Sequence, residues 1–195
     1  MAWSIALLVY VVLQFVAFMF VLVATPIDMY RFRIGSVHSF FPDHCITLWG
    51  VKVVCSNLAY ESSSDAEWAL CPTRRDRFRA AQAFAVISIF VYLAAFLLGV
   101  IMLFCCRYLR WVCLALNCFG AVTVCIVWVA IVVSYNRDDG DDCFVVAEFY
   151  NYGIGFFLLL VAWVLDILNI PVLLLLWHDC CSGGSVKSID NESQV

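Results

Sequence analysis

Long apolar stretches separated by polar ones dominate the chain. Four of them, residues 3–24, 80–104, 111–134 and 152–177, exceed the roughly 18 apolar residues that indicate a membrane-spanning helix. None of the four contains Lys or Arg, and only the last contains an acidic residue, Asp166. A chain inside hydrocarbon must satisfy its backbone hydrogen bonds internally, so this pattern predicts four helices packed as a bundle.

The polar stretches divide the chain into two larger loops, a short connection and a tail. The loops are residues 25–79 and 135–151, the connection is 105–110, and the tail is 178–195. With four crossings, both termini and the short connection share one side of the membrane. The two larger loops share the other side.

Composition narrows the class of protein further. The chain of 195 residues is 65% hydrophobic and 13% charged, which excludes an ordinary soluble domain. Its net charge of -4 argues against a nucleic-acid partner, which requires a basic face. The sequence contains no phosphate-binding loop, dinucleotide fingerprint, zinc-hydrolase helix or nucleophile elbow. We therefore expect neither an enzyme nor a cofactor.

The most informative segment of the long loop begins at Cys45 and ends at Cys55. Its β-branched and aromatic residues favour extended structure. In one continuous strand the two cysteines would lie ~30 Å apart, and each would need a partner from Cys71 and Cys143. If the chain instead turns at Gly50, Cys45 and Cys55 become cross-strand neighbours and can pair directly. The sequence does not decide between these arrangements.

The spacing in this segment resembles the signature of the amastins, four-span surface proteins of kinetoplastid parasites. The residues that carry the resemblance are Cys45, Thr47, Leu48, Trp49, Gly50, Lys52 and Cys55. The segment departs from the family pattern at Val54, where a small polar or acidic residue is usual. The number of spans, the loop lengths and the short tail agree with the family as well.

The resemblance implies a claudin-like plan with both termini cytoplasmic and both larger loops exposed at the cell surface. Leu48-Trp49 matches the Leu-Trp pair in the first extracellular loop of claudins, whereas the cysteine spacing after the tryptophan differs. The resemblance also implies a structural or interaction role at the parasite plasma membrane, in contact with host membranes. Within the cap formed by the first loop, we expect the signature residues to carry the fold.

The distribution of basic residues opposes this orientation. The side with the larger loops carries Arg31, Arg33, Lys52, Arg74, Arg75, Arg77, Arg79 and Arg137, and the other side carries Arg107, Arg110 and Lys187. Read literally, the positive-inside rule would place the long loop in the cytosol. The rule weakens as loops lengthen, so the objection stays open at this point.

Cysteine positions favour the loops being outside the cell. The larger loops hold an even set of candidate disulfide cysteines, Cys45, Cys55, Cys71 and Cys143. Two adjacent pairs, Cys105 with Cys106 and Cys180 with Cys181, lie at helix ends on the opposite side. Cysteines next to the membrane on the cytosolic side are candidate palmitoylation sites, and the alternative is that they are ordinary small apolar residues.

One polar patch lies deep inside the fourth span. Asn169 shares a helix face with Asp166, and Pro171 frees a backbone carbonyl beside that face. Gln14 in the first span is the expected partner, followed by Asn117. The patch could relay protons or bind a cation, or it could be a hydrogen-bonded clasp between helices. We favour the clasp, because a lone acid without a second ionisable partner makes a poor relay.

Two charged runs lie in the loops. Residues 74–79 form an arginine-rich run next to the second span, which we expect to be a solvated helix entrance. Residues 138–142 form an acidic turn that lacks the ligand spacing of a calcium-binding loop. We expect this turn to be exposed.

These observations predict one domain over residues 1–195, an all-α membrane protein with a small β-rich extracellular cap from the first loop. The expected function is that of a multi-pass surface protein with a structural or interaction role. The alternative is a component of proton or ion transport that uses Asp166 and Asn169. The expected partners are the lipid bilayer and components of host or neighbouring membranes. The oligomeric state stays open, a homo-oligomer included.

Overall fold

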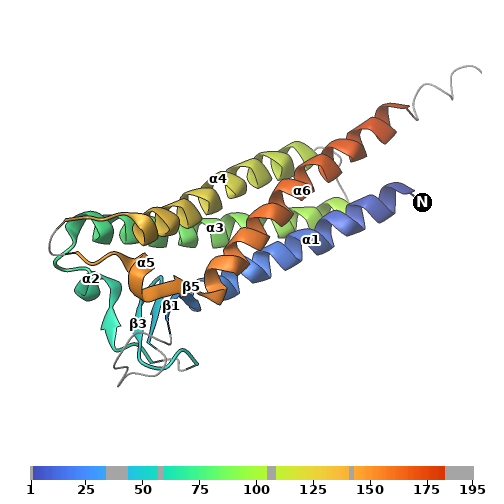
Figure 1. Ribbon diagram of the computed structural model, residues 1–195. Coiled ribbons are helices and arrows are strands. Elements are labelled where there is room, and N and C mark those ends of the chain that lie inside the picture. Colours follow the sequence, from blue (N-terminus) through green and yellow to red (C-terminus); the bar gives the residue numbers. More distant parts are fainter. Residues whose placement is uncertain (1, 34–43, 57–58, 105–108, 141–142, 183–195) are drawn as a thin grey trace, which may run out of the picture.

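The protein is built around four long helices that run side by side (Figure 1). The computed structural model describes residues 2–33, 44–56, 59–104, 109–140 and 143–182, with the backbone alone for 2–4 and 176–182. The helices are α1 (Ala2–Ala24), α3 (Pro72–Phe104), α4 (Leu109–Asn136) and α6 (Ile154–Ser182). All four are long and apolar enough to cross a membrane, which confirms the predicted four-helix membrane fold.

The four helices form a closed ring. Helix α1 packs against α3 and α6, and α4 packs against the same two helices, so α1 lies diagonally opposite α4. Small residues at the contacts let the helices approach closely. A Cβ added to Gly99 of α3, for example, would come within 2.9 Å of the Tyr10 ring of α1.

Helix α3 is longer than its apolar stretch. It begins at Pro72 rather than near residue 80, because proline is well suited to a first helical position and the arginine-rich run continues the helix. Its 33 residues correspond to roughly 50 Å, well beyond the hydrocarbon thickness. Figure 1 shows α3 and α4 reaching past the ends of α1 and α6 on the side of the sheet. The first turns of α3 therefore belong to the cap.

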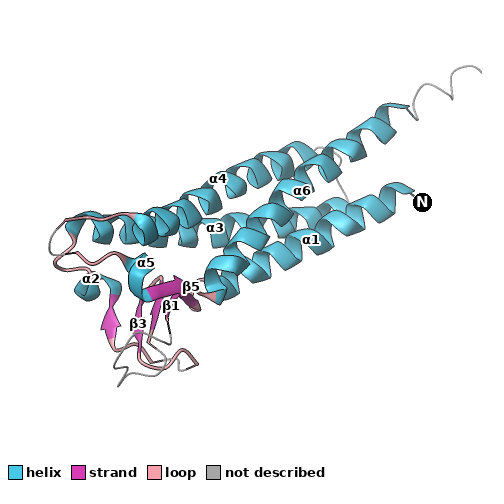
Figure 2. Ribbon diagram, viewed as in Figure 1, coloured by secondary structure: helices cyan, strands magenta, loops and turns pink. Residues whose placement is uncertain are grey.

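The cap contains one antiparallel sheet of five short strands (Figure 2). In spatial order they are β4 (Ser62–Ser63), β3 (Gly50–Lys52), β2 (Cys45–Thr47), β1 (Asp28–Phe32) and β5 (Tyr150–Tyr152). Two short helices, α2 (Ser64–Glu67) and α5 (Val146–Phe149), precede α3 and β5. Strand β5 comes from the second loop, so the sheet draws on both larger loops and not on the first alone.

The core of the cap continues into the bundle. Met29, Tyr30 and Ile46 of the sheet belong to the same buried cluster as residues of α1, α3, α4 and α6. The Tyr30 hydroxyl donates a 2.6 Å hydrogen bond to the backbone carbonyl of Ile131 in α4. Burial raises the pKa of Tyr30 well above its ordinary value, so this donor keeps its proton. The sheet is thereby attached directly to a membrane helix.

Candidate functional site

The signature segment folds as a tight hairpin closed by a disulfide. Strands β2 and β3 pair around a reversal at Leu48 and Trp49, which brings Cys45 beside Lys52. Cys45 and Cys55 are bonded, with their Cα atoms 5.5 Å apart. Of the two arrangements that the sequence allowed, the chain adopts the turn.

Thr47 and Gly50 form the turn itself. Thr47 Oγ1 accepts hydrogen bonds from the backbone N–H groups of Trp49 at 3.2 Å and Gly50 at 3.1 Å. The same hydroxyl donates to the Gly50 carbonyl at 2.8 Å. A Cβ at Gly50 would collide with the carbonyl of Ser62 in β4, so only glycine allows the two strands to approach this closely.

Leu48 and Lys52 attach the hairpin to its surroundings. Leu48 is fully buried, and its carbonyl accepts a 2.9 Å hydrogen bond from Gln82 of α3. Gln82 also donates to the Ser64 hydroxyl at 2.7 Å. The Lys52 side chain is only 5% exposed, and its ammonium group donates to the Pro26 carbonyl at 3.1 Å. These signature side chains point inward and hold the cap together.

A second disulfide joins the two larger loops. Cys71, directly before α3, is bonded to Cys143 of the second loop, with their Cα atoms 5.8 Å apart. The bond spans 72 positions of sequence. It fixes the second loop against the start of α3, where the arginine-rich run begins.

Arg74 is fully buried beside this disulfide. Its Nε donates to Asp139 Oδ2 at 3.3 Å, and its two terminal nitrogens donate to the carbonyls of Phe144 at 2.9 Å and Arg137 at 3.3 Å. The guanidinium carbon lies 5.0 Å from the Trp68 ring centroid and 5.7 Å from that of Phe144. Hydrogen bonds and aromatic faces thus replace the water that this cation loses on burial.

Asp139 also binds Arg77, at 3.0 and 2.7 Å through two parallel hydrogen bonds. Burial acts to raise the pKa of Asp139, but the hydrogen bonds and charges of Arg77 and Arg74 outweigh it and hold the pKa below its usual value. The expectation that both charged runs are exposed is therefore wrong at these positions. The physical reason is that α3 extends into the cap and faces the acidic turn. Arg79 remains half-exposed and pairs with Asp65 instead.

Directly after β3, at the open end of the hairpin and opposite its turn, the chain presents apolar side chains, and we call this surface the tip of the cap. Val53, Val54 and Tyr60 are each about two-fifths exposed. Together with Ala59 and Glu61 they line a hollow of about 150 Å³. The Lys52 ammonium lies 4.9 Å from the Tyr60 ring centroid and supports one wall. The hairpin, which the Cys45–Cys55 disulfide closes, thus carries an accessible apolar surface.

The predicted intramembrane patch belongs to a larger cluster of buried hydrogen bonds. Asn169 of α6 donates to the Gln14 side-chain oxygen of α1 at 2.8 Å. Asn117 of α4 donates to the Tyr10 hydroxyl of α1 at 3.0 Å, across the diagonal of the ring. All four side chains are at most 1% exposed.

Tyr92 and Asp166 span the other diagonal. The Tyr92 hydroxyl of α3 donates to Asp166 Oδ2 of α6 at 3.0 Å. Gly120 of α4 provides the space, because a Cβ there would lie 2.9 Å from the Tyr92 ring and 3.1 Å from the Asp166 carboxylate. Tyr10 and Tyr92 are not among the residues that the sequence predicted for this patch. Their only sequence signal is a hydroxyl-bearing ring deep within an apolar span.

Three acceptor atoms of this cluster are buried without a donor among the described residues. They are the Oδ1 atoms of Asn117, Asp166 and Asn169. In each residue the other polar atom makes a hydrogen bond between helices. The cluster therefore contains hydrogen bonds between helices and, beside them, three oxygen atoms that could accept a further hydrogen bond.

A comparison with protein families identifies the chain. A family model described as amastin surface glycoprotein matches residues 15–173, which include the cap and most of the bundle. The chain belongs to the amastin family. No curated protein matches it. Together with the four apolar helices, membership of this family makes it a multi-pass surface protein of the plasma membrane.

The candidate palmitoylation sites of this amastin stay predictions. Cys105 and Cys106 lie outside the described residues. Cys180 and Cys181 lie in the last turns of α6, where the side chains are outside the described part.

Proposed function

We propose that this amastin is a structural and interaction protein whose cap faces the outside of the cell and contacts host or neighbouring membranes. The observation that carries the proposal is the exposed apolar tip formed by Val53, Val54 and Tyr60. Clustered apolar side chains on a polar loop region favour a partner surface over water. Both termini lie in the cytoplasm in this proposal.

Rigidity of the cap supports this role. The hairpin that carries the tip is closed by the Cys45–Cys55 disulfide. The second disulfide and the buried Arg74–Asp139 pair attach the rest of the cap to α3. A preorganised surface loses less conformational entropy on binding than a flexible loop does.

Thiol labelling of intact cells tests the orientation. With a membrane-impermeant reagent, Cys45, Cys55, Cys71 and Cys143 are expected to label only after mild reduction. Cys180 and Cys181 are expected to label only after the cells are permeabilised. If the loop cysteines also require permeabilisation, the cap lies inside the cell and the contact function must be withdrawn.

Vesicle tethering tests the contact itself. The full chain, reconstituted with its cap outward, is mixed with protein-free phosphatidylcholine vesicles, and tethering is followed by dynamic light scattering. The variant V53S/V54S/Y60S is expected to lose tethering, whereas the exposed control Arg79→Gln retains it. Equal tethering by the triple variant would exclude the tip as the contact surface. No tethering by the unmodified protein would exclude a bare lipid bilayer as the partner.

Transport through the bundle is a second candidate function. It is favoured by three buried acceptor oxygens, those of Asn117, Asp166 and Asn169, which could coordinate a cation. Of the three residues, Asp166 is the one that could receive a proton. Flux of protons or monovalent cations into liposomes containing the full chain tests it. Asp166→Asn is expected to abolish such a flux, and an unchanged flux would remove the cluster from consideration.

A further inference from the structure

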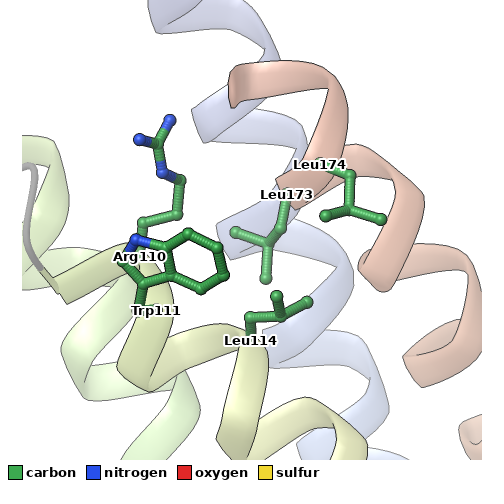
Figure 3. A pocket seen from close by; sticks show the side chains of 5 residues that line it. All are labelled: Arg110, Trp111, Leu114, Leu173 and Leu174. Carbon is green, nitrogen blue, oxygen red and sulfur yellow. The ribbon is translucent and has the colours of Figure 1, made fainter. Parts of the chain in front are cut away.

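A crevice lies between α4 and α6 (Figure 3), near the start of α4 and therefore at the end of the bundle opposite the cap (Figure 1). It is a shallow groove that is open to its surroundings, and it is lined by Arg110, Trp111, Leu114, Leu173 and Leu174. Leu173 is buried, whereas Trp111 and Leu174 are about half-exposed. The buried Leu173 forms the base of the crevice, and Trp111 and Leu174 form its exposed sides. Because these helices span the membrane, the crevice opens towards the acyl chains of the surrounding lipid.

The upper end of the crevice lies at the membrane surface. Arg110 and Trp111 stand in the first turn of α4, whose 28 residues correspond to about 42 Å, enough to cross the hydrocarbon and reach both interfaces. In Figure 3 the Arg110 guanidinium points away from the leucines, while the Trp111 indole lies beside Leu114 and Leu173. Tryptophan favours the interface, and arginine extends its charged end towards the lipid headgroups.

Arg110 is the charged residue of the crevice lining, and its guanidinium favours an anionic ligand. The sequence 105–110, which joins α3 to α4, contains Arg107 and Arg110 and no acidic residue. No residue from 80 to 136 is acidic, and the acidic residues on this side of the membrane, Asp179, Asp190 and Glu192, all follow the fourth span. A guanidinium has five N–H donors in a fork that matches phosphate oxygens, so Arg110 can bind a phosphate in addition to its contacts within the protein.

The ligand must also be apolar over most of its length. Apart from Arg110, the lining consists of three leucines and the face of an indole. A free phosphate or a soluble headgroup would leave this lining uncovered. A phospholipid with one acyl chain in the crevice and its phosphate on Arg110 would cover the apolar lining and pair with the guanidinium at the same time.

We propose that this crevice binds an anionic phospholipid from the leaflet on the side of the short connection. One acyl chain lies against Leu114, Leu173 and Leu174, and the phosphate lies on the Arg110 guanidinium. The proposal does not depend on the function of the cap, which is at the other end of the bundle.

Quenching of tryptophan fluorescence by brominated lipids tests this site. The full chain is placed in phosphatidylcholine nanodiscs that contain increasing fractions of phosphatidylserine or phosphatidylcholine with brominated acyl chains. The difference between the unmodified protein and Trp111→Phe isolates the Trp111 signal from the other tryptophans. Half-maximal quenching of Trp111 is expected at a roughly fivefold lower fraction of phosphatidylserine than of phosphatidylcholine, as one arginine near the surface predicts.

Two variants test the two parts of the site separately. Arg110→Gln is expected to bring the ratio close to one, while Arg79→Gln, which removes a cation in the cap, is expected to keep it fivefold. Leu174→Phe narrows the crevice from α6 with Arg110 intact, and it is expected to reduce the preference as well. Melting curves verify that each variant is folded.

Three results would overturn the proposal. Equal quenching by both brominated lipids in the unmodified protein would show that no anionic lipid is selected. A preference that survives both Arg110→Gln and Leu174→Phe would place the selection elsewhere. Loss of the preference in excess soluble glycerophosphoserine would show a headgroup site that does not require the acyl chain.

Discussion

Arg74 and Asp139 form an ion pair that is shielded from solvent and joins the two larger loops. The Arg74 side chain is 0% exposed and that of Asp139 3%. Arg77 donates two further hydrogen bonds to the same carboxylate. The buried charges of Arg74 and Asp139 are therefore paired inside the cap, directly beside the disulfide between Cys71 and Cys143. Both the ion pair and the disulfide join the start of α3 to the second loop.

Removing the charge of Asp139 should destabilise the cap strongly. Asp139→Asn leaves the buried Arg74 cation without its anionic partner, and such a change costs about 3 kcal/mol of unfolding free energy. The matched control is Asp65→Asn, which removes the partner of the exposed Arg79 and should leave the stability unchanged. Denaturant unfolding of the purified protein in detergent measures both. Similar stabilities of the two variants would contradict the structural role of Asp139.

Stability should also depend on pH through the same carboxylate. The pKa of Asp139 is lowered in the folded protein, so its contribution is fully present above the unfolded-state value of about 4. That contribution is lost as the pH falls through the folded-state pKa, where the carboxylate binds a proton. The melting temperature of the unmodified protein should therefore fall more steeply below pH 4 than that of Asp139→Asn. Parallel curves would show that other groups cause the acid sensitivity.

The two disulfides should differ in their contribution to stability. A cross-link removes more entropy from the unfolded chain when it closes a longer loop. The bond between Cys71 and Cys143, with a sequence separation of 72, should contribute about 4 kcal/mol. The bond between Cys45 and Cys55, with a separation of 10, should contribute about 3 kcal/mol.

Paired replacement by alanine tests this order. The double variants C71A/C143A and C45A/C55A are compared in thermal unfolding under non-reducing conditions, and the former should melt at the lower temperature. The reverse order would indicate that strain or residual structure outweighs loop entropy.

The hydrogen bond between Gln14 and Asn169 should couple α1 to α6. Such bonds inside membrane proteins contribute about 0.6 kcal/mol on average, with a maximum of about 1.7. A double-mutant cycle of Gln14→Leu and Asn169→Leu should therefore give a coupling energy in this range. Leu168→Ala, at an exposed position of α6, should show no coupling to Gln14→Leu. A coupling near zero for Gln14 and Asn169 would indicate that the clasp does not fix the packing of these helices.

The four spans, their connectivity and the family were readable from the sequence alone. The bilayer imposes a requirement on each segment by itself, since about 20 apolar residues must follow one another wherever a helix crosses. The signature around Leu48 and Trp49 is likewise contiguous, and the turn that it forms depends mainly on the neighbouring Thr47 and Gly50. Local information was sufficient for these features.

Only the tertiary structure decided which distant groups meet. Strand β5 pairs with β1 although the two strands come from different loops. Nothing in the three residues of β5 predicts this pairing. From the sequence, Arg74 and Asp139 are expected to be solvated charges. They are buried because α3 extends into the cap. Tyr92 finds Asp166 because Gly120 leaves room across the diagonal. Each of these contacts depends on side chains from separate elements, whose proximity is set by packing and not by spacing along the chain.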